Sequence, residues 1–143
     1  MKIRDARTGD EPELASLTTE LGYPSTPEEI ARRLPSVLAG DDQRFLVAAD
    51  DNDRAIGWIH VALIRTIEND AHAQIMGLVV TAAQRSAGIG ARLLAEAEAW
   101  ARAKGMESVR VRSNVTRERT HGFYLRAGYA ITKTSYLFVK PLA

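Results

Sequence analysis

The spacing of hydrophobic residues changes between two patterns along this chain, and each pattern predicts one kind of element. Short apolar or alternating runs predict strands, which are expected at Lys2–Ala6, Arg44–Ala49, Ala55–Ile64, Ala73–Val80, Ser108–Arg112, Tyr129–Thr132 and Tyr136–Val139. Apolar residues three or four positions apart predict helices, which are expected at Asp10–Leu21, Thr26–Leu38, Arg92–Lys104 and Thr116–Ala127. The predicted order of elements is β-α-α-β-β-β-α-β-α-β-β.

Capping and turn residues set the ends of several of these elements. Thr8-Gly9-Asp10-Glu11 and Thr26-Pro27-Glu28-Glu29 each have the spacing of a capping box, which predicts the starts of the first two helices. Asp50-Asp51-Asn52-Asp53 predicts a hairpin turn between two strands. Gly105 and Gly128 predict the ends of the third and fourth helices, because glycine adopts the left-handed conformation found there.

This order of elements predicts a mixed α/β (α+β) fold with a mostly antiparallel central sheet flanked by helices. Ala73–Val80 is apolar on both faces, so we expect this strand inside the sheet. The long helix that follows it leads to Ser108–Arg112, so these two strands are expected to be parallel. Residues 1–143 are expected to form a single domain, which is an ordinary size for one core.

Composition excludes several classes of protein. The chain has no cysteine, and its three histidines have no helical i,i+4 pairing, so no disulfide and no metal site are predicted. The N-terminus has no apolar segment after its first charges, and no apolar run approaches the roughly 20 residues of a membrane span. We therefore expect a cytoplasmic protein without a membrane partner. A net charge of +1 does not suggest nucleic acid as a partner.

The charges are unevenly distributed between the two halves of the chain. Residues 1–80 carry 8 Lys and Arg against 14 Asp and Glu, whereas residues 81–143 carry 11 against 4. The basic half suits a polyanionic ligand. The acidic half fits either a cationic substrate or a set of aspartates that solvate turns, and the sequence does not separate the two readings.

A basic, glycine-containing loop follows the apolar run Leu78-Val79-Val80. This loop, Arg85-Ser86-Ala87-Gly88-Ile89-Gly90-Ala91, opens a long helix. Helix N-termini and free backbone N–H groups bind phosphate, and glycine lets a phosphate approach where a Cβ would collide. No lysine follows Gly90, as a nucleoside-triphosphate loop requires, and Leu93 stands where a dinucleotide fingerprint has its third glycine. The loop therefore predicts a phosphate-bearing ligand of another kind.

The loop and a second block resemble the GNAT superfamily of acyl-CoA-dependent N-acyltransferases. The second block consists of Asn114-Val115-Thr116-Arg117 and the segment His121–Tyr129. The nearest resemblance is to small bacterial members such as the aminoalkylphosphonate N-acetyltransferases, especially over Ser113–Leu142. It implies an enzyme that moves an acetyl group from acetyl-CoA to the primary amine of a small molecule by direct attack on the thioester.

The resemblance also implies which residues bind the coenzyme. The strand backbone would hold the pantetheine arm and supply an oxyanion-binding N–H, and the loop would hold the pyrophosphate. Tyr124 would be catalytic, as proton donor to the coenzyme sulfur, although Phe123-Tyr124 could instead be an aromatic pair of the core. Ala87 stands where many relatives carry a second basic residue. The implied coenzyme-binding residues are Leu78, Val79, Val80, Arg85, Ser86, Ala87, Gly88, Ile89, Gly90, Ala91, Asn114, Arg117 and Tyr124.

The sequence does not identify a general base. Close relatives often place glutamates shortly before the Leu-Val-Val run, where this chain has Gln74 and Met76, and neither can accept a proton at neutral pH. Either another group acts, or the amine needs no dedicated base, or the substrate differs from that of the phosphonate-acetylating relatives. The candidates for another group are His60, His72, Glu68 and Asp70.

Other readings stay open at this stage. The chain could be a non-catalytic acyl-CoA sensor, or it could acetylate a protein amine. The loops Gly22–Ser25 and Arg65–Ala71 are expected to form the walls of the acceptor site, because they are polar connecting segments. The alternation of Tyr136 and Phe138 in the last strand suits either a homodimer interface or core packing.

Overall fold

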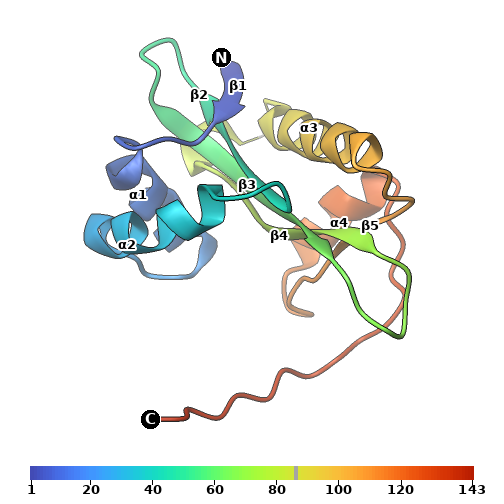
Figure 1. The fold of residues 1–143 in the computed structure, drawn as a ribbon. Coiled ribbons are helices and arrows are strands. Elements are labelled where there is room, and N and C mark those ends of the chain that lie inside the picture. Colours follow the sequence, from blue (N-terminus) through green and yellow to red (C-terminus); the bar gives the residue numbers. More distant parts are fainter. Residues whose placement is uncertain (86) are drawn as a thin grey trace. The chain divides into compact units, whose positions relative to one another are not determined.

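The structure is a computed structural model that describes residues 1–85 and 87–143, and the chain divides into two compact units, Met1–Val111 and Arg112–Ala143 (Figure 1). The second unit contains one helix, α4 (Glu118–Arg126). The elements of the first unit are β1 (Lys2–Asp5), α1 (Glu11–Leu21), α2 (Pro27–Leu38), β2 (Gln43–Ala49), β3 (Ala55–Ile64), β4 (His72–Val80), the 3₁₀ turn η1 (Ala82–Gln84), α3 (Ile89–Ala103) and β5 (Val109–Val111).

The strands of the first unit form one sheet in the order β1-β2-β3-β4-β5. The first four strands are antiparallel neighbours, and β4 and β5 are parallel, joined by α3. The mixed, mostly antiparallel fold predicted from the sequence is therefore confirmed, with β4 inside the sheet. Among the described residues no helix is long and apolar enough to cross a membrane.

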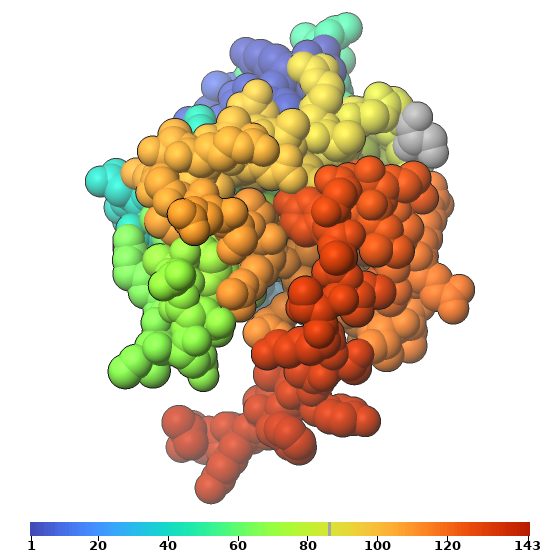
Figure 2. All heavy atoms as spheres, turned by 90° about the vertical axis from the view of Figure 1, so that its right-hand side faces the viewer, coloured from blue at the N-terminus to red at the C-terminus, as the bar shows by residue number. Residues whose placement is uncertain are grey.

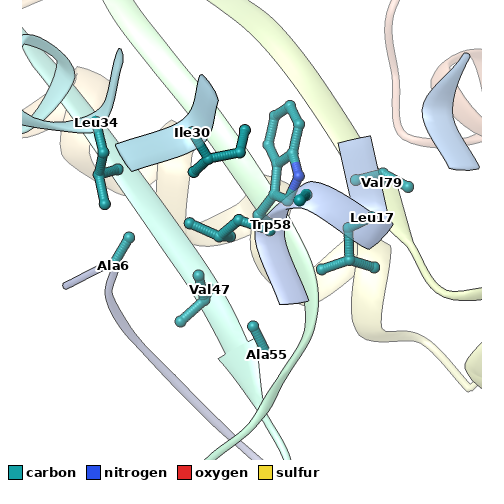
Figure 3. Close-up of a cluster of buried hydrophobic side chains, with 10 residues drawn as sticks. Ala6, Leu17, Ile30, Leu34, Val47, Ala55, Trp58 and Val79 are labelled. Atoms are coloured by element: carbon teal, nitrogen blue, oxygen red, sulfur yellow. The ribbon is translucent and has the colours of Figure 1, made fainter. Parts of the chain in front are cut away.

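Helices cover both faces of this sheet, with α1 and α2 on one side and α3 on the other (Figure 1). Figure 3 shows the core under α1 and α2, where Leu17, Ile30 and Leu34 meet Val47 and Trp58 of the sheet. On the other face α3 buries the residues of its apolar stripe. These are Ile89, Leu93, Leu94, Ala97 and Ala101.

A β-bulge interrupts β4. His60 of β3 pairs with Gly77, and the next residue, Val61, pairs with Ile75, so Met76 has no counterpart on β3. The bulge also marks the end of the parallel pairing, because β5 pairs only with residues 73–75 of β4. Beyond Met76, β4 is held by β3 on one edge, and no strand of the described residues pairs with its other edge.

The residue after the bulge has no side chain, and an indole ring occupies the space where one would be. A Cβ added at Gly77 would lie 2.7 Å from Cη2 and 2.8 Å from Cζ3 of Trp58, which are contacts that real Cβ atoms do not make. The Trp58 side chain is buried, and its Nε1–H has no hydrogen-bond partner among the described residues. Gly77 and Trp58 therefore form one tightly packed unit beside the bulge.

One guanidinium joins three distant segments of the first unit. Arg4 of β1 donates two hydrogen bonds, of 2.9 and 3.0 Å, to the carboxylate of Asp10 at the start of α1. Its Nε donates a third, of 2.9 Å, to Asp53 in the turn between β2 and β3. Burial alone would raise the pKa of Asp10, but hydrogen bonds from Arg4 and from the Arg7 N–H, with both positive charges, outweigh burial and lower that pKa.

Two predicted helix starts differ from the observed ones. The capping box at Thr26 and Glu29 is confirmed, with hydrogen bonds of 3.0 and 3.1 Å. The box predicted at Thr8 and Glu11 is wrong, since Asp10 is the N-cap residue and its carboxylate binds Arg4 instead of capping. The third helix begins at Ile89, before the predicted Arg92, because Gly88 adopts a left-handed conformation and serves as its N-cap.

The two strands predicted at the C-terminus are wrong, because residues 130–143 contain no helix or strand. The side chains of residues 136–139 are between 79% and 91% exposed, and this segment extends from the unit (Figure 2). The prediction failed because alternating residues show only that a segment can form a strand. A strand also needs a hydrogen-bonding neighbour, which a local pattern does not supply.

We expect the Gly77→Ala variant to be destabilised by about 2 kcal/mol, because the new methyl group overlaps the Trp58 ring. Urea unfolding measures the loss. In a Trp58→Leu background the same substitution should cost little, because the overlapping ring atoms are gone. An equal cost in both backgrounds would show that the ring is not what excludes the methyl group.

We expect Asp10→Asn to lower the free energy of unfolding by about 2 kcal/mol at pH 7, because the buried Arg4 loses one of its two paired carboxylates and keeps only Asp53. The pKa of Asp10 is lowered in the folded protein, so its stabilisation is complete above about pH 4, the unfolded value, and is lost as the pH falls through the folded pKa. Urea unfolding at pH 7 and pH 3 should therefore show the difference between wild type and variant shrinking in acid. Asp51→Asn, at the neighbouring turn, is the control with little expected effect.

Candidate active site

Beyond the bulge, some peptide groups of β4 point away from β3, toward the edge of β4 that no described strand pairs with. The Thr81 N–H donates to the carbonyl of Ile56 at 2.9 Å, so Thr81 faces β3. In an antiparallel pair the direction alternates, which turns Val79 toward β3 and the peptide groups of Leu78 and Val80 toward the open edge. The Val80 carbonyl accordingly accepts a hydrogen bond of 3.2 Å from Nε of Arg85. The Val79 side chain is buried in the core, so backbone and side chain serve different purposes here.

The loop after β4 delivers the N-terminus of α3 to the same end of the strand. Gly88 has φ +80°, which only glycine adopts without strain, and it has open space where a Cβ would be. Among the described residues no side chain caps α3, so the N–H groups of its first turn, at Ile89, Gly90 and Ala91, suit an anion. Ser86, also predicted to bind the coenzyme, lies outside the described residues.

A carboxylate that the sequence analysis missed ties this region to α1. Glu20 accepts hydrogen bonds from Thr81 Oγ1 at 3.1 Å and from the Ala82 N–H at 3.0 Å. It thereby fixes the end of β4 and the start of η1 against the last turn of α1. Glu20 is separated from these partners by about sixty residues, and no local motif marks it.

In the second unit, Asn114 organises the start of α4. Its Oδ1 accepts hydrogen bonds from the N–H and the hydroxyl of Thr116, at 2.9 and 2.8 Å. Its carbonyl accepts one of 3.0 Å from the N–H of Arg117, the N-cap residue of α4, and one of 2.8 Å from Nε2 of His121. Two of the expected coenzyme-binding residues, Asn114 and Arg117, therefore share one turn.

Tyr124 is the buried residue of α4, with 8% of its surface exposed. Its ring packs edge-on against Phe123 and Tyr129, with centroid distances of 5.1 and 5.6 Å. Burial raises the pKa of the Tyr124 phenol to about 12. The aromatic contact and a chemical role are compatible, because the phenol remains protonated at every physiological pH.

The four candidates for a general base differ in their surroundings. His60 on β3 lies with Nε2 2.7 Å from Oε1 of Gln43, and burial lowers the pKa of its imidazole. His72 is almost fully buried, and its Nδ1 donates to the carbonyl of Asp70 at 3.1 Å. Glu68 and Asp70 are exposed in the loop between β3 and β4.

The structure gathers the expected site residues into two groups, one in each unit. The first group is the open edge of β4, Arg85 and the start of α3, and the second is Asn114, Arg117 and Tyr124 around α4. Met76 is the bulge residue and is half-exposed. In the described part of the chain, no three His, Asp or Glu side chains are grouped as a metal site requires.

A strand with a free edge, followed by a helix start that suits phosphate, is an arrangement that fits an extended phosphate-bearing ligand. Residues 11–129 match the Acetyltransferase (GNAT) family, and the chain belongs to this family. It is an N-acetyltransferase, as the motifs Arg85–Ala91 and His121–Tyr129 predicted.

Individual relatives agree with this assignment. The uncharacterized N-acetyltransferase YhdJ of Bacillus subtilis is 35% identical over 133 residues, which cover 92% of this chain and 88% of that protein. An aminoalkylphosphonate N-acetyltransferase of Salmonella typhimurium is 41% identical over 69 residues, which cover 48% of this chain and 44% of that protein. The structure of AAC(6')-Iy in complex with the bisubstrate analogue CoA-S-monomethyl-acetylneamine has the same fold, with a TM-score of 0.84, 17% identity and coverage of 98% and 97% of the two chains.

We expect ultraviolet titration to detect one tyrosine that ionises only near pH 12, because burial disfavours the charged phenolate of Tyr124. Tyr124→Phe should remove this ionisation, whereas Tyr136→Phe, at an exposed position, should leave it in place. Circular dichroism at each pH checks that the fold persists. If Tyr124→Phe removed an ionisation near pH 10 instead, the phenol would not be desolvated as described.

Proposed function

We propose that this acetyltransferase moves an acetyl group from acetyl-CoA to the primary amine of a small molecule. The observation that carries the proposal is the free edge of β4 beyond the bulge, next to the uncapped start of α3. An extended arm with amide groups can pair with such an edge, and a pyrophosphate can bind at such a helix start. AAC(6')-Iy, with the same fold, holds a CoA-based analogue, which supports coenzyme A as the ligand here.

The coenzyme-binding residues have distinct parts in this proposal. The peptide groups of Leu78 and Val80 bind the amides of the pantetheine arm, while Val79 anchors the strand through its buried side chain. Arg85 and the segment Ala87–Ala91 bind the pyrophosphate. The segment lacks a second basic residue at Ala87, so backbone N–H groups carry most of this contact. Asn114 and Arg117, which share one turn at the start of α4, are the other coenzyme-binding residues of this proposal.

The reaction is a direct transfer from sulfur to nitrogen. The amine nitrogen attacks the thioester carbonyl, a C–N bond forms, and the C–S bond breaks as the tetrahedral intermediate collapses. The carbonyl oxygen becomes negative on the way, and a backbone N–H of the Leu78–Val80 edge stabilises it by a hydrogen bond. No covalent acyl-enzyme is needed.

Tyr124 acts on the leaving sulfur as a hydrogen-bond donor. A full proton transfer from a phenol of pKa about 12 to a thiolate of pKa about 8.5 would be uphill by about 5 kcal/mol. A hydrogen bond from the neutral phenol still stabilises the developing thiolate, and solvent then protonates the free coenzyme. Burial thus favours a donor that stays neutral throughout the reaction.

The acceptor is a small amine rather than a protein, and residues 1–143 act as one catalytic domain. The relatives named above include one for aminoalkylphosphonates, and a neamine derivative is part of the analogue bound to AAC(6')-Iy. The loops Gly22–Ser25 and Arg65–Ala71 form the walls of the acceptor site, and Tyr23 and Ile67 stand exposed in them. The enzyme works in the cytoplasm, and its exposed C-terminal segment contributes to a homodimer interface.

We expect wild-type protein to release thiol from acetyl-CoA only when an amine is present. The panel contains aminophosphonates, aminoglycosides, polyamines and amino acids, and release is followed with a thiol reagent between pH 6 and 9.5. Tyr124→Phe should reduce kcat about 100-fold while the calorimetric Kd for CoA stays within twofold, because one donor to the transition state is lost. Tyr136→Phe is the matched control.

Two results would contradict this proposal. Acetyl-CoA binding without turnover of any amine would indicate a sensor or an acceptor outside the panel. Full activity of Tyr124→Phe would show that Tyr124 takes no part in the chemistry. The proposed coenzyme-binding role of β4 and α3 would not be affected by that result.

A further inference from the structure

His60 is held in one orientation by two neighbours on β2. Its Nε2 lies 2.7 Å from Oε1 of Gln43, and its ring lies 5.5 Å from the ring of Phe45. An amide oxygen can only accept a hydrogen bond, so Nε2 of the neutral ring carries the proton. Nδ1 is then the basic atom of the imidazole, and no hydrogen bond to Nδ1 is found in the described part of the chain.

The position of His60 in the sheet brings it beside the bulge. Its partner on β4 is Gly77, the residue between Met76 and Leu78. Leu78 is the first residue whose peptide groups face the free edge. His60 therefore stands one strand away from the point at which the proposed thioester-binding edge begins.

Among the described residues, the cross-strand neighbours of His60 and the buried residues of the helices on its face carry no ionisable group. Across the sheet its neighbours are Phe45 on β2 and Gly77 on β4. The buried side chains that the helices direct toward this face are all apolar. They are Leu14, Ala15 and Leu17 of α1 and Ile30 and Leu34 of α2. Burial without a compensating charge lowers the pKa of His60, so the imidazole is neutral at pH 7.

We propose that His60 is the base of this enzyme and that Gln43 is the positioning residue that orients it. This inference rests on the proposed function. When the amine attacks the thioester, its nitrogen becomes positively charged as the C–N bond forms. Nδ1 of His60 accepts the proton from this nitrogen, the C–S bond breaks, and His60 later returns the proton to solvent.

The other candidates lack such an arrangement. His72 is also bound through one ring nitrogen, but its side chain is buried at the start of β4, where β5 pairs alongside. Glu68 and Asp70 lie in an exposed loop. Only His60, among the four, combines an oriented ring, a basic atom without a bound donor and a place beside the bulge.

The test is the pH dependence of kcat/KM with acetyl-CoA and 2-aminoethylphosphonate, or the panel amine with the highest wild-type rate. Deprotonation of the amine alone makes log kcat/KM rise with a slope of one. In the wild type we expect the slope to approach two below the pKa of His60, which burial lowers from its ordinary value. His60→Gln should lose this second unit of slope and reduce kcat about 100-fold.

Gln43→Glu tests the positioning role without removing the base. A carboxylate beside Nε2 favours the imidazolium, so the break in the profile should move upward by about one pH unit. A purely structural role of Gln43 would not move it. His72→Gln is the matched control, and its profile should keep the wild-type break. Urea unfolding confirms that each variant is folded.

The outcomes separate this inference from the proposed function. Amine-dependent release by the wild type, with an unchanged profile in His60→Gln or an unmoved break in Gln43→Glu, overturns the role of His60 or of Gln43 and leaves the acetyltransfer intact. Loss of the break in His72→Gln would assign the base to His72. No amine-dependent release by the wild type overturns both proposals.

Discussion

The single extra residue in β4 is the constraint on which the rest of the site depends. Met76 has no counterpart on β3, and at this point the parallel pairing with β5 ends. The strand beyond it keeps its hydrogen bonds to β3, so it stays rigid while its other edge is free. Gly77 allows the Trp58 ring to pack against this half of the strand. This half of β4 thus offers backbone groups to a ligand although β4 is an inner strand of the sheet.

Burial has opposite effects on the pKa values of the two side chains proposed to act in the reaction, and both effects favour the uncharged form. It raises the pKa of Tyr124 and lowers that of His60, so the phenol and the imidazole are both neutral near pH 7. This differs from a site that depends on a carboxylate base, for which Gln74 and Met76 leave no place on β4. Amines react only in their neutral form, and an uncharged, apolar surrounding disfavours an ammonium.

Local patterns in the sequence predicted most of the fold, because helices and inner strands follow from the spacing of apolar residues. The same patterns failed for residues 130–143, where a strand would need a neighbour that no local feature specifies. The motif around Gly88 predicted the loop that opens α3, where Gly88 has a left-handed φ, and phosphate binding there stays a prediction. The contacts of Glu20 with Thr81 and of Gln43 with His60 join different elements, so they emerged only from the folded chain.

The packing of Trp58 gives the molecule an optical probe of its own. The chain has two tryptophans, and the other, Trp100, lies on α3 with the Lys104 ammonium 5.9 Å from its ring centroid. The Trp58 indole rests on Gly77 in an apolar environment, so its fluorescence is sensitive to small movements of the free half of β4. With Trp100 replaced by phenylalanine, emission would come from this one ring. Ligand arrival at the strand edge could then be followed in real time, without any label.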